Sequence, residues 1–195
     1  MGSIESENQK KSDIQGLVSA AAAGDQKAYE ALYNEYAPKI SRFIAFRVNH
    51  KETAEDLIAE VFIKAWQSLQ NNSDISSFQS WIFTIARNKI IDHYRTRKSF
   101  TDLFELENIL EYEDKIVRAI DLDIASKEFL QVLDKLTPDQ QQIIRLKFLE
   151  DLDNEEIAAV MDKSIGTVRV IQHRAITTLK KHITRSNKII RRNNI

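Results

Sequence analysis

The sequence of 195 residues contains no cysteine, only four glycines and two prolines, and no long hydrophobic run. The absence of cysteine excludes disulfides, thiolate-bound zinc and a cysteine nucleophile. A membrane-spanning helix needs about 20 consecutive apolar residues, and no segment of this chain approaches that length. The first residues, MGSIESENQKKSD, are polar and lack the apolar core of a signal peptide. We therefore expect a cytoplasmic protein without membrane insertion.

Hydrophobic residues make up 43% of the chain, which is enough to form hydrophobic cores and excludes a wholly disordered protein. They recur every three or four residues, the spacing of amphipathic helices, rather than alternating as in strands. Because glycine and proline are so scarce, the pattern predicts an all-α protein. The length allows one or two domains.

Charged residues are segregated along the chain, although the formal net charge is only −1. Residues 99–126 carry eight acidic and two basic side chains, whereas the segment from Lys163 to the C-terminus carries nine basic and no acidic ones. Such a basic segment is typical of a protein that contacts nucleic acid. The acidic segment is long for a loop inside one domain, so we expect a flexible linker between two small helical domains.

The stretch from Asp153 to Lys181 has the pattern of a helix-turn-helix. Asp153 and Glu156 predict a capping box at the start of a short helix. Ser164 is suited to cap a second helix, because its hydroxyl can accept from amides of the first turn. One side of the second helix is apolar, at Ile165, Val168, Ile171, Ala175, Ile176 and Leu179. Its other side is polar and basic, as in the DNA-reading helix of this motif.

Further helices are expected before the helix-turn-helix. They cover residues 13–23, the stretch from Asp25 to about Val48, residues 53–69 and the stretch from Phe78 to about Lys98. Asp25 is expected to cap the second of them, and Pro38 to kink or divide it. Thr137, Pro138 and Gln140 predict another helix start, with a capping box and proline at the first helical position.

Two polar surfaces in the first half of the chain are candidates for binding. Asp56, Glu60 and Lys64 recur every four residues, which indicates either a solvated face with ion pairs or a protein-docking face. The helix from Phe78 is basic and carries Trp81. Basic side chains interleaved with aromatic rings suit single-stranded nucleic acid, because cations follow the phosphates while rings stack on bases. Trp81 fits a hydrophobic core equally well.

The sequence contains no recognisable catalytic arrangement. It has neither of the glycine-rich nucleotide-binding motifs and no evident serine–histidine–aspartate set. Its four histidines are dispersed along the chain without the partners that a metal site needs. We therefore expect no enzyme activity, no cofactor and no metal.

Three segments of the chain each resemble a part of one protein family and follow one another in the same order as in that family. They are AEDLIAEVFIKAWQSL at residues 54–69, FQSWIFTIARNKIIDHYR at residues 78–95, and LDKLTPDQQQIIRLKFLEDLDNEEIAAVMDKSIGTVRVIQHRA at residues 133–175. They resemble the clamp-binding helix, the promoter-melting segment and the −35-reading domain of the extracytoplasmic-function sigma factors. That class is the small two-domain branch of the bacterial sigma-70 family. The resemblance covers most of the chain.

The resemblance implies five parts. They are a disordered N-terminal extension at residues 1–12, sigma region 2 at residues 13–98, the acidic linker at residues 99–126, sigma region 4 at residues 127–185 and a basic tail at residues 186–195. Region 2 would bind core RNA polymerase and the −10 promoter element, and region 4 the −35 element. The implied partners are bacterial core RNA polymerase, double-stranded and melted promoter DNA, and an anti-sigma factor. The implied location is the cytoplasm, at the nucleoid.

The resemblance also implies roles for individual residues. Those that would dock on the polymerase are Asp56, Glu60 and Lys64. Those that would handle the −10 DNA are Asn71 and Asn72, in a loop that captures a flipped base, together with Trp81, Arg87, Asn88, Lys89 and Arg95. Those that would enter the −35 major groove are Ser164, Thr167, Arg169, Gln172 and Arg174. The family often has glycine near the turn, where this chain has Asp162 and Lys163.

Other functions compete with this interpretation. A helix-turn-helix regulator that does not join polymerase would use residues 13–98 for dimerisation or sensing. A protein-binding sigma mimic would not need the basic charge that follows Lys163. A helical enzyme is the most distant alternative.

Overall fold

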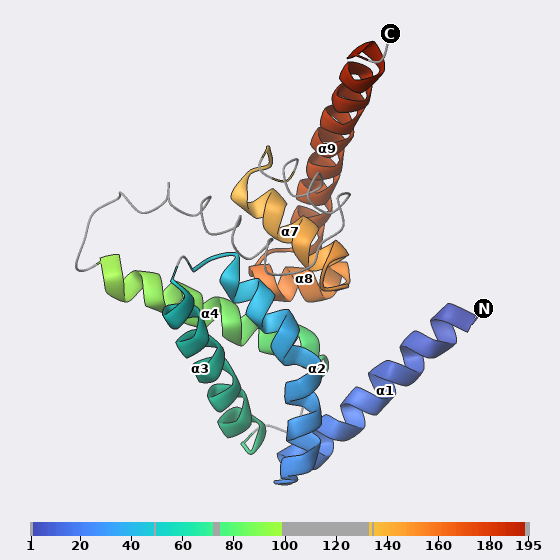
Figure 1. The fold of residues 1–195 in the computed structure, drawn as a ribbon. Coiled ribbons are helices and arrows are strands. Elements are labelled where there is room, and N and C mark those ends of the chain that lie inside the picture. The colour runs from blue at the N-terminus through green and yellow to red at the C-terminus, as the bar shows by residue number, and fades with distance from the viewer. Residues whose placement is uncertain (1, 49, 72–74, 99–132, 134, 194–195) are drawn as a thin grey trace. The chain divides into compact units, whose positions relative to one another are not determined.

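The structure is a computed structural model and describes residues 2–48, 50–71, 75–98, 133 and 135–193. These residues form seven helices and no strand, which confirms the all-α prediction (Figure 1). Helices α1 to α4 belong to one compact unit, and α7 to α9 to another. Within the described ranges, no helix combines the length and the apolar character needed to cross a membrane.

The first unit is a bundle of four helices. They are α1 (Gly2–Ala22), α2 (Gln26–Ala45), α3 (Lys51–Leu69) and α4 (Phe78–Lys98). α1 packs on α2, α2 packs on α3 and α4, and α3 packs on α4 (Figure 1). The rings of Phe43 and Phe83 meet edge to face in the core, with centroids 5.1 Å apart. The Tyr29 hydroxyl donates to the carbonyl of Phe62 at 2.5 Å, and its burial raises the pKa of Tyr29 well above the ordinary value.

α1 begins much earlier than predicted. We expected a disordered extension over residues 1–12, but the helix runs from Gly2 and ends before Gly24, which has a φ of +95°. Lys10 reaches across to α2, where its Nζ lies 2.9 Å from Glu35 Oε1. Gln9 donates to Asp13 one turn later, at 2.9 Å. Such polar contacts extend a helix in a segment whose composition shows no apolar stripe.

α2 is not divided at Pro38, although the sequence predicted a kink or a break there. Asp25 caps the helix as predicted, accepting from the amides of Lys27 and Ala28 at 2.9 and 3.2 Å. Proline removes one backbone hydrogen bond, but buried Tyr36 and Ile40 hold the helix on the core at both sides of it. α3 begins at Lys51, with His50 at the N-cap, rather than at Thr53.

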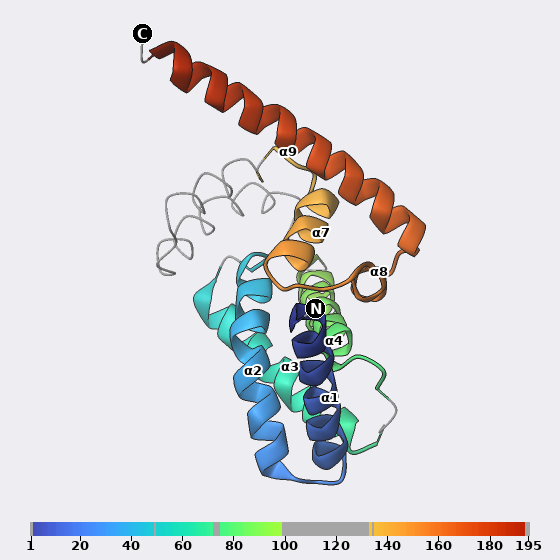
Figure 2. The same ribbon diagram turned by 90° about the vertical axis from the view of Figure 1, so that its right-hand side faces the viewer.

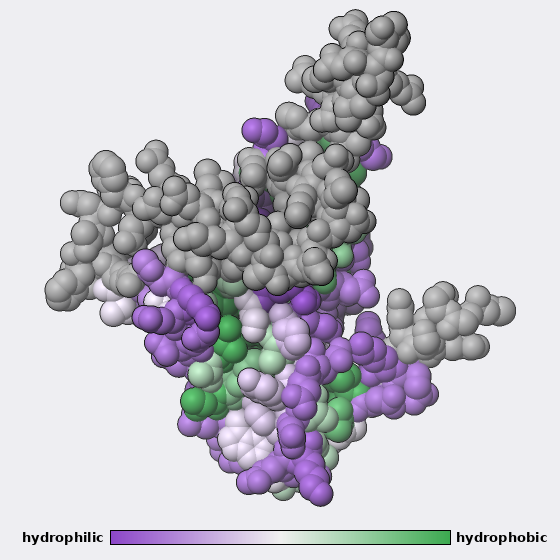
Figure 3. Space-filling view, viewed as in Figure 1, coloured by the Kyte–Doolittle hydropathy of each residue, from purple (hydrophilic) through white to green (hydrophobic). Residues whose placement is uncertain are grey.

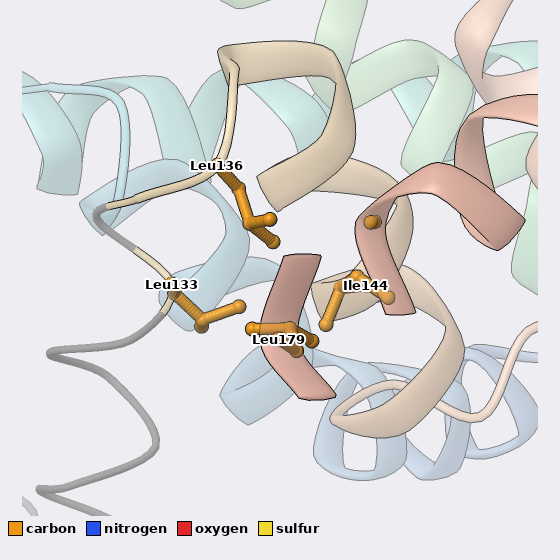
Figure 4. Close-up of a cluster of buried hydrophobic side chains, with 5 residues drawn as sticks. Leu133, Leu136, Ile144 and Leu179 are labelled. Carbon is orange, nitrogen blue, oxygen red and sulfur yellow. The ribbon is translucent and has the colours of Figure 1, made fainter. Parts of the chain in front are cut away.

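The second unit consists of α7 (Pro138–Phe148), α8 (Asn154–Met161) and α9 (Ile165–Asn193). Its core includes a cluster of Leu133, Leu136, Ile144, Ala175 and Leu179 (Figure 4). Leu133 and Leu136 thereby fix the segment before α7 against α9. α9 continues well past α7 and α8 (Figure 2). Residues 186–193, predicted as a separate tail, are therefore helical, because no glycine or proline follows Gly166 to end the helix.

The boundaries of the two domains stay predictions. The expected acidic linker at residues 99–126 lies outside the described residues, as do Asn72 and residues 127–132. The short 70–77 loop is described only at its two ends.

Candidate nucleic-acid interface

The helix-turn-helix is present in the second unit, and its first helix has the predicted capping box. Asp153 accepts hydrogen bonds from the amides of Glu155 and Glu156 at 2.9 and 2.8 Å. Glu156 in turn accepts from the amide of Asp153 at 2.9 Å. The start of α8 is therefore fixed by its own sequence. α7 likewise begins with Pro138 at its first position, and Gln140 accepts from the Thr137 amide at 3.1 Å.

The turn between α8 and α9 depends on Asp162, which has a left-handed backbone with a φ of 54°. The Asp162 amide donates to Ala159 and the Lys163 amide to Ala158, at 3.3 and 3.0 Å. These two bonds form a Schellman motif, which usually carries glycine at this position. Aspartate tolerates the conformation better than most residues. Lys163 also holds the turn to α7, because its Nζ lies 3.1 Å from Asp139 Oδ2.

The N-terminus of α9 carries two hydroxyls that are already paired with each other. Ser164 Oγ accepts from the Thr167 amide at 3.1 Å and lies 2.8 Å from the Thr167 hydroxyl. The predicted cap is therefore confirmed. Both side chains are exposed beside the free amides of the first turn, where a phosphate oxygen finds donors and a favourable dipole.

The surface of α9 separates into a buried and an exposed side. Its buried side chains are Val168, Ala175 and Leu179, and its exposed side includes Thr167, Arg169, Val170, His173 and Arg174. Gln172 is half-buried at the margin. The structure thus brings four of the five predicted −35 residues to one exposed stretch. Val170, which was not among the predicted site residues, is 51% exposed on the same stretch, and its apolar side chain suits contact with a thymine methyl group in a major groove.

One face of α3 in the first unit combines charged and apolar residues. Asp56, Glu60 and Lys64 are exposed there, as their spacing predicted. Ile63 lies between Glu60 and Lys64 in the sequence and is 58% exposed, although it was not among the predicted site residues. Figure 3 shows hydrophobic surface beside hydrophilic surface over α3. Exposed apolar area rimmed by charge is typical of a protein-docking surface.

α4 exposes two of its five predicted nucleic-acid residues and the other three only in part. Asn88 and Arg95 are exposed, whereas Arg87 and Lys89 are half-buried. Arg95 Nη2 lies 3.5 Å from Asp92 Oδ1 on its own helix. The C-terminal half of α4 is fixed to the bundle, because the Tyr94 hydroxyl donates to the carbonyl of Arg47.

Trp81 is neither a core residue nor a free ring. It is half-buried, and its ring centroid lies 5.6 Å from that of Phe78. Phe78 is buried and packs edge to face on Tyr36 at 5.1 Å. The bundle therefore supports the indole of Trp81 on one side and leaves part of it accessible for stacking.

The two predicted surfaces of the first unit meet at an ion pair. Lys89 Nζ on α4 lies 2.6 Å from Glu60 Oε2 on α3. A predicted DNA contact is thus bonded to a predicted docking residue.

Asn71, at the described end of the 70–77 loop, is exposed. Its side-chain nitrogen donates to the carbonyl of Gln67 at 2.9 Å, so that this amide is held on the end of α3. In this rotamer a base contact would use the amide oxygen or the second N–H of the same side chain. Among the described residues, no three histidine, aspartate or glutamate side chains lie close enough together to hold a metal ion.

The chain matches two family models, one on each compact unit. Residues 32–100 match Sigma-70 region 2, and residues 132–181 match Sigma-70, region 4. Helices α3 and α4 lie inside the first match, and α7 and α8 with the first part of α9 inside the second.

Curated relatives show the same similarity over nearly the whole chain. RNA polymerase sigma factor YlaC of Bacillus subtilis is 32% identical over 162 residues, which cover 82% of this chain and 94% of that protein. The ECF RNA polymerase sigma factor BldN of Streptomyces coelicolor is 32% identical over 168 residues, or 85% of this chain. The match spans 64% of BldN, less than two thirds of its length.

Solved structures with 22% identity share the fold. CnrH, in complex with the cytosolic domain of CnrY, superimposes with a TM-score of 0.63 over 88% of this chain and 97% of that one. The sigma factor RpoE of Bartonella quintana, in complex with the anti-sigma factor NepR, superimposes with a TM-score of 0.58 over 81% of this chain and 98% of that one.

Proposed function

Because this chain belongs to the extracytoplasmic-function sigma factors of the sigma-70 family, we propose that its two units divide promoter recognition between them. The unit of α7 to α9 reads the −35 element, and the unit of α1 to α4 docks on core polymerase and opens the DNA at −10. The observation that carries this proposal is the exposed basic stretch of α9 directly after a capped helix-turn-helix turn, in the unit that matches region 4.

The −35 element is read by α9 in the major groove, which admits a helix and displays a distinct pattern of donors and acceptors for each base pair. Arg169 is placed to reach base edges, because it is exposed within the first turns of the helix. Gln172 reaches the groove from the margin of the same face. Ser164 and Thr167 bind phosphate at the helix N-terminus, and Arg174 contacts the backbone farther along.

The −10 element is opened by the segment from Asn71 to Arg95. A base must leave the stack, which costs a few kcal/mol, and stacking and edge contacts then hold it. The half-buried ring of Trp81 offers a stacking surface, while Lys89 and Arg95 follow the phosphates of the separated strand. The captured strand offsets the cost of opening, so that no nucleotide hydrolysis is required. The protein itself catalyses no reaction.

The polymerase docks on the face of α3 that carries Asp56, Glu60 and Lys64. Ile63 is exposed beside these residues on the same helix and adds apolar area to the docking face. The sigma factor RpoE of Bartonella quintana was solved in complex with the anti-sigma factor NepR. We propose that an anti-sigma factor also binds this chain. We further propose that the chain acts in the cytoplasm, at the nucleoid.

In vitro transcription tests this function. Full-length protein is mixed with bacterial core polymerase and a library of linear promoters, and transcripts are mapped to their start sites. We expect initiation from a subset of promoters that share elements spaced as −35 and −10. A reference sigma factor under the same conditions serves as the control. No transcript from any promoter while the reference is active would refute the proposal. Protein that binds DNA but not core polymerase would indicate the regulator instead.

A further inference from the structure

Gln15 connects α1 to the segment that leads into α4. Its side-chain nitrogen Nε2 donates to the backbone carbonyl of Ile75 at 3.2 Å. The two residues are distant in the sequence, so this hydrogen bond joins α1 to a segment far along the chain. Gln15 also lies outside the residues that match region 2, which begin at residue 32. Its role is therefore not one that the family match assigns.

Ile75 and Ser77, at the two ends of the segment before α4, are both held by contacts. The side chain of Ile75 is only 5% exposed and is anchored in the bundle. Ser77 caps α4, because its hydroxyl accepts from the amide of Ser80 at 3.3 Å. The Trp81 amide donates to the carbonyl of Ser77 at 3.1 Å. The position of Ile75 thus sets where α4 starts, and the start of α4 sets where Trp81 stands.

We infer that Gln15 is a positioning residue for strand opening at −10. This inference rests on the proposed function and deepens it. Trp81 can stack on a base only if α4, the helix that carries it, begins in the right place. Without the Gln15 side chain, the Ile75 carbonyl loses its partner on α1 and the start of α4 gains freedom. That freedom must be removed again while the first base leaves the paired duplex. The loss of Gln15 therefore weakens opening of a paired promoter without touching the DNA-binding side chains themselves.

Three variants separate this role from others. Gln15→Ala removes the donor and most of the side chain. Gln15→Glu keeps the length and shape but places a carboxylate against the Ile75 carbonyl, so that no hydrogen bond forms at neutral pH. Gln9→Ala is the matched control, because Gln9 lies on the same helix but donates within it, to Asp13.

The experiment measures opening by the permanganate reactivity of −10 thymines, with each variant in complex with core polymerase. Two templates are compared: a fully paired promoter, and the same promoter with a mismatched, already opened −10 segment. Core affinity and the unfolding midpoint are measured in parallel. We expect both Gln15 variants to lower opening of the paired promoter by about three- to tenfold, the effect of losing one partly buried hydrogen bond. For both Gln15 variants, the permanganate reactivity of the mismatched promoter and the core affinity should stay within about twofold of wild type. Gln9→Ala should open the paired promoter within about twofold of wild type.

Other outcomes overturn the inference. Wild-type opening by Gln15→Glu would mean that the hydrogen bond does not matter. An equal loss on both templates, or a matching loss of core affinity, would mean that Gln15 only supports the fold. A wild-type protein that does not open the paired promoter would refute the proposed function and this inference with it. A wild-type protein that opens the paired promoter while both variants match it would refute the inference alone.

Discussion

Lys89 Nζ lies 2.6 Å from Glu60 Oε2, so that a residue proposed to hold −10 DNA is paired with one proposed to dock on polymerase. The side chains are 32% and 53% exposed. At such exposure the pair contributes at most about 1 kcal/mol to stability. Its larger consequence is electrostatic, because Glu60 neutralises a charge that a phosphate would otherwise meet. A partner that binds Glu60 would release Lys89 for DNA.

Glu60→Gln is therefore expected to strengthen binding of a single-stranded −10 oligonucleotide to the protein without core polymerase, because Glu60 pairs with Lys89 in the free protein. The gain should not exceed about 1 kcal/mol at low salt and should shrink as salt screens the charges. Fluorescence anisotropy with a labelled oligonucleotide measures it.

Asp56→Asn is the matched control for Glu60→Gln, because it removes one negative charge from the same exposed face of α3. An equal gain in both variants would show that only net charge matters, and would contradict a specific role of the ion pair. Charge reversal at either residue should weaken core binding, and unchanged core affinity at low salt would remove that residue from the docking surface.

Asp162→Gly is expected to stabilise the second unit by about 0.5–1 kcal/mol, because glycine adopts the left-handed φ of 54° without a side-chain penalty. Asp162→Ala should destabilise it, since alanine lacks the short polar side chain that eases this conformation. Urea unfolding of the full chain, followed by helical circular dichroism, gives both values. A shift of both variants in the same direction would show that the backbone conformation is not the cause.

The local signals in the sequence were sufficient to place most of the helices. The capping residues Asp25 and Asp153 and the start of α7 at Pro138 were found because a cap depends on neighbours a few residues away. The exposure of Ile63 was also within reach, because this position falls off the apolar stripe of α3. When only the apolar residues at core spacing are considered, an apolar residue outside that spacing, such as Ile63, is overlooked.

Features that depend on distant contacts were not predictable. The early start of α1 relies on Lys10 meeting Glu35 on another helix, and the Glu60–Lys89 pair joins two helices whose packing the sequence does not state. Pro38 was misjudged for the same reason, since burial of Tyr36 and Ile40 outweighs the loss of one hydrogen bond. In each case tertiary packing overrides a local rule.

Arg169→Ala is expected to relax the preference at one position of the −35 element by about 1–3 kcal/mol, because an arginine at a base edge discriminates between bases. Arg174→Ala should instead weaken binding evenly across sequences and lower its salt dependence. Binding to a randomised −35 library, with each variant in complex with core polymerase, distinguishes the two patterns. Uniform weakening by Arg169→Ala would show that this residue contacts only phosphate.

Lys10→Gln is expected to destabilise the first unit near neutral pH but not in acid. A hydrogen bond from Lys10, and then the bond and charge of Lys39, lower the pKa of Glu35 below its ordinary value of 4.5. A carboxyl whose pKa is lowered in the folded state stabilises the protein above the unfolded pKa, and this contribution is lost as pH falls through the folded pKa. Removing Lys10 should therefore cost less than about 1 kcal/mol at pH 7, since the pair is partly exposed.

The pair of Lys10 and Glu35 is tested by a double-mutant cycle. Urea unfolding of the full chain is measured at pH 7 and at about pH 2, well below the ordinary glutamate pKa of 4.5, for Lys10→Gln, for Glu35→Gln and for the double variant. If the contact exists, the two changes are not additive at pH 7 and become additive in acid, where protonated Glu35 no longer attracts Lys10. Additivity at both pH values would mean that α1 does not reach Glu35, and the helical state of the residues before 13 would then lose the contact that supports it.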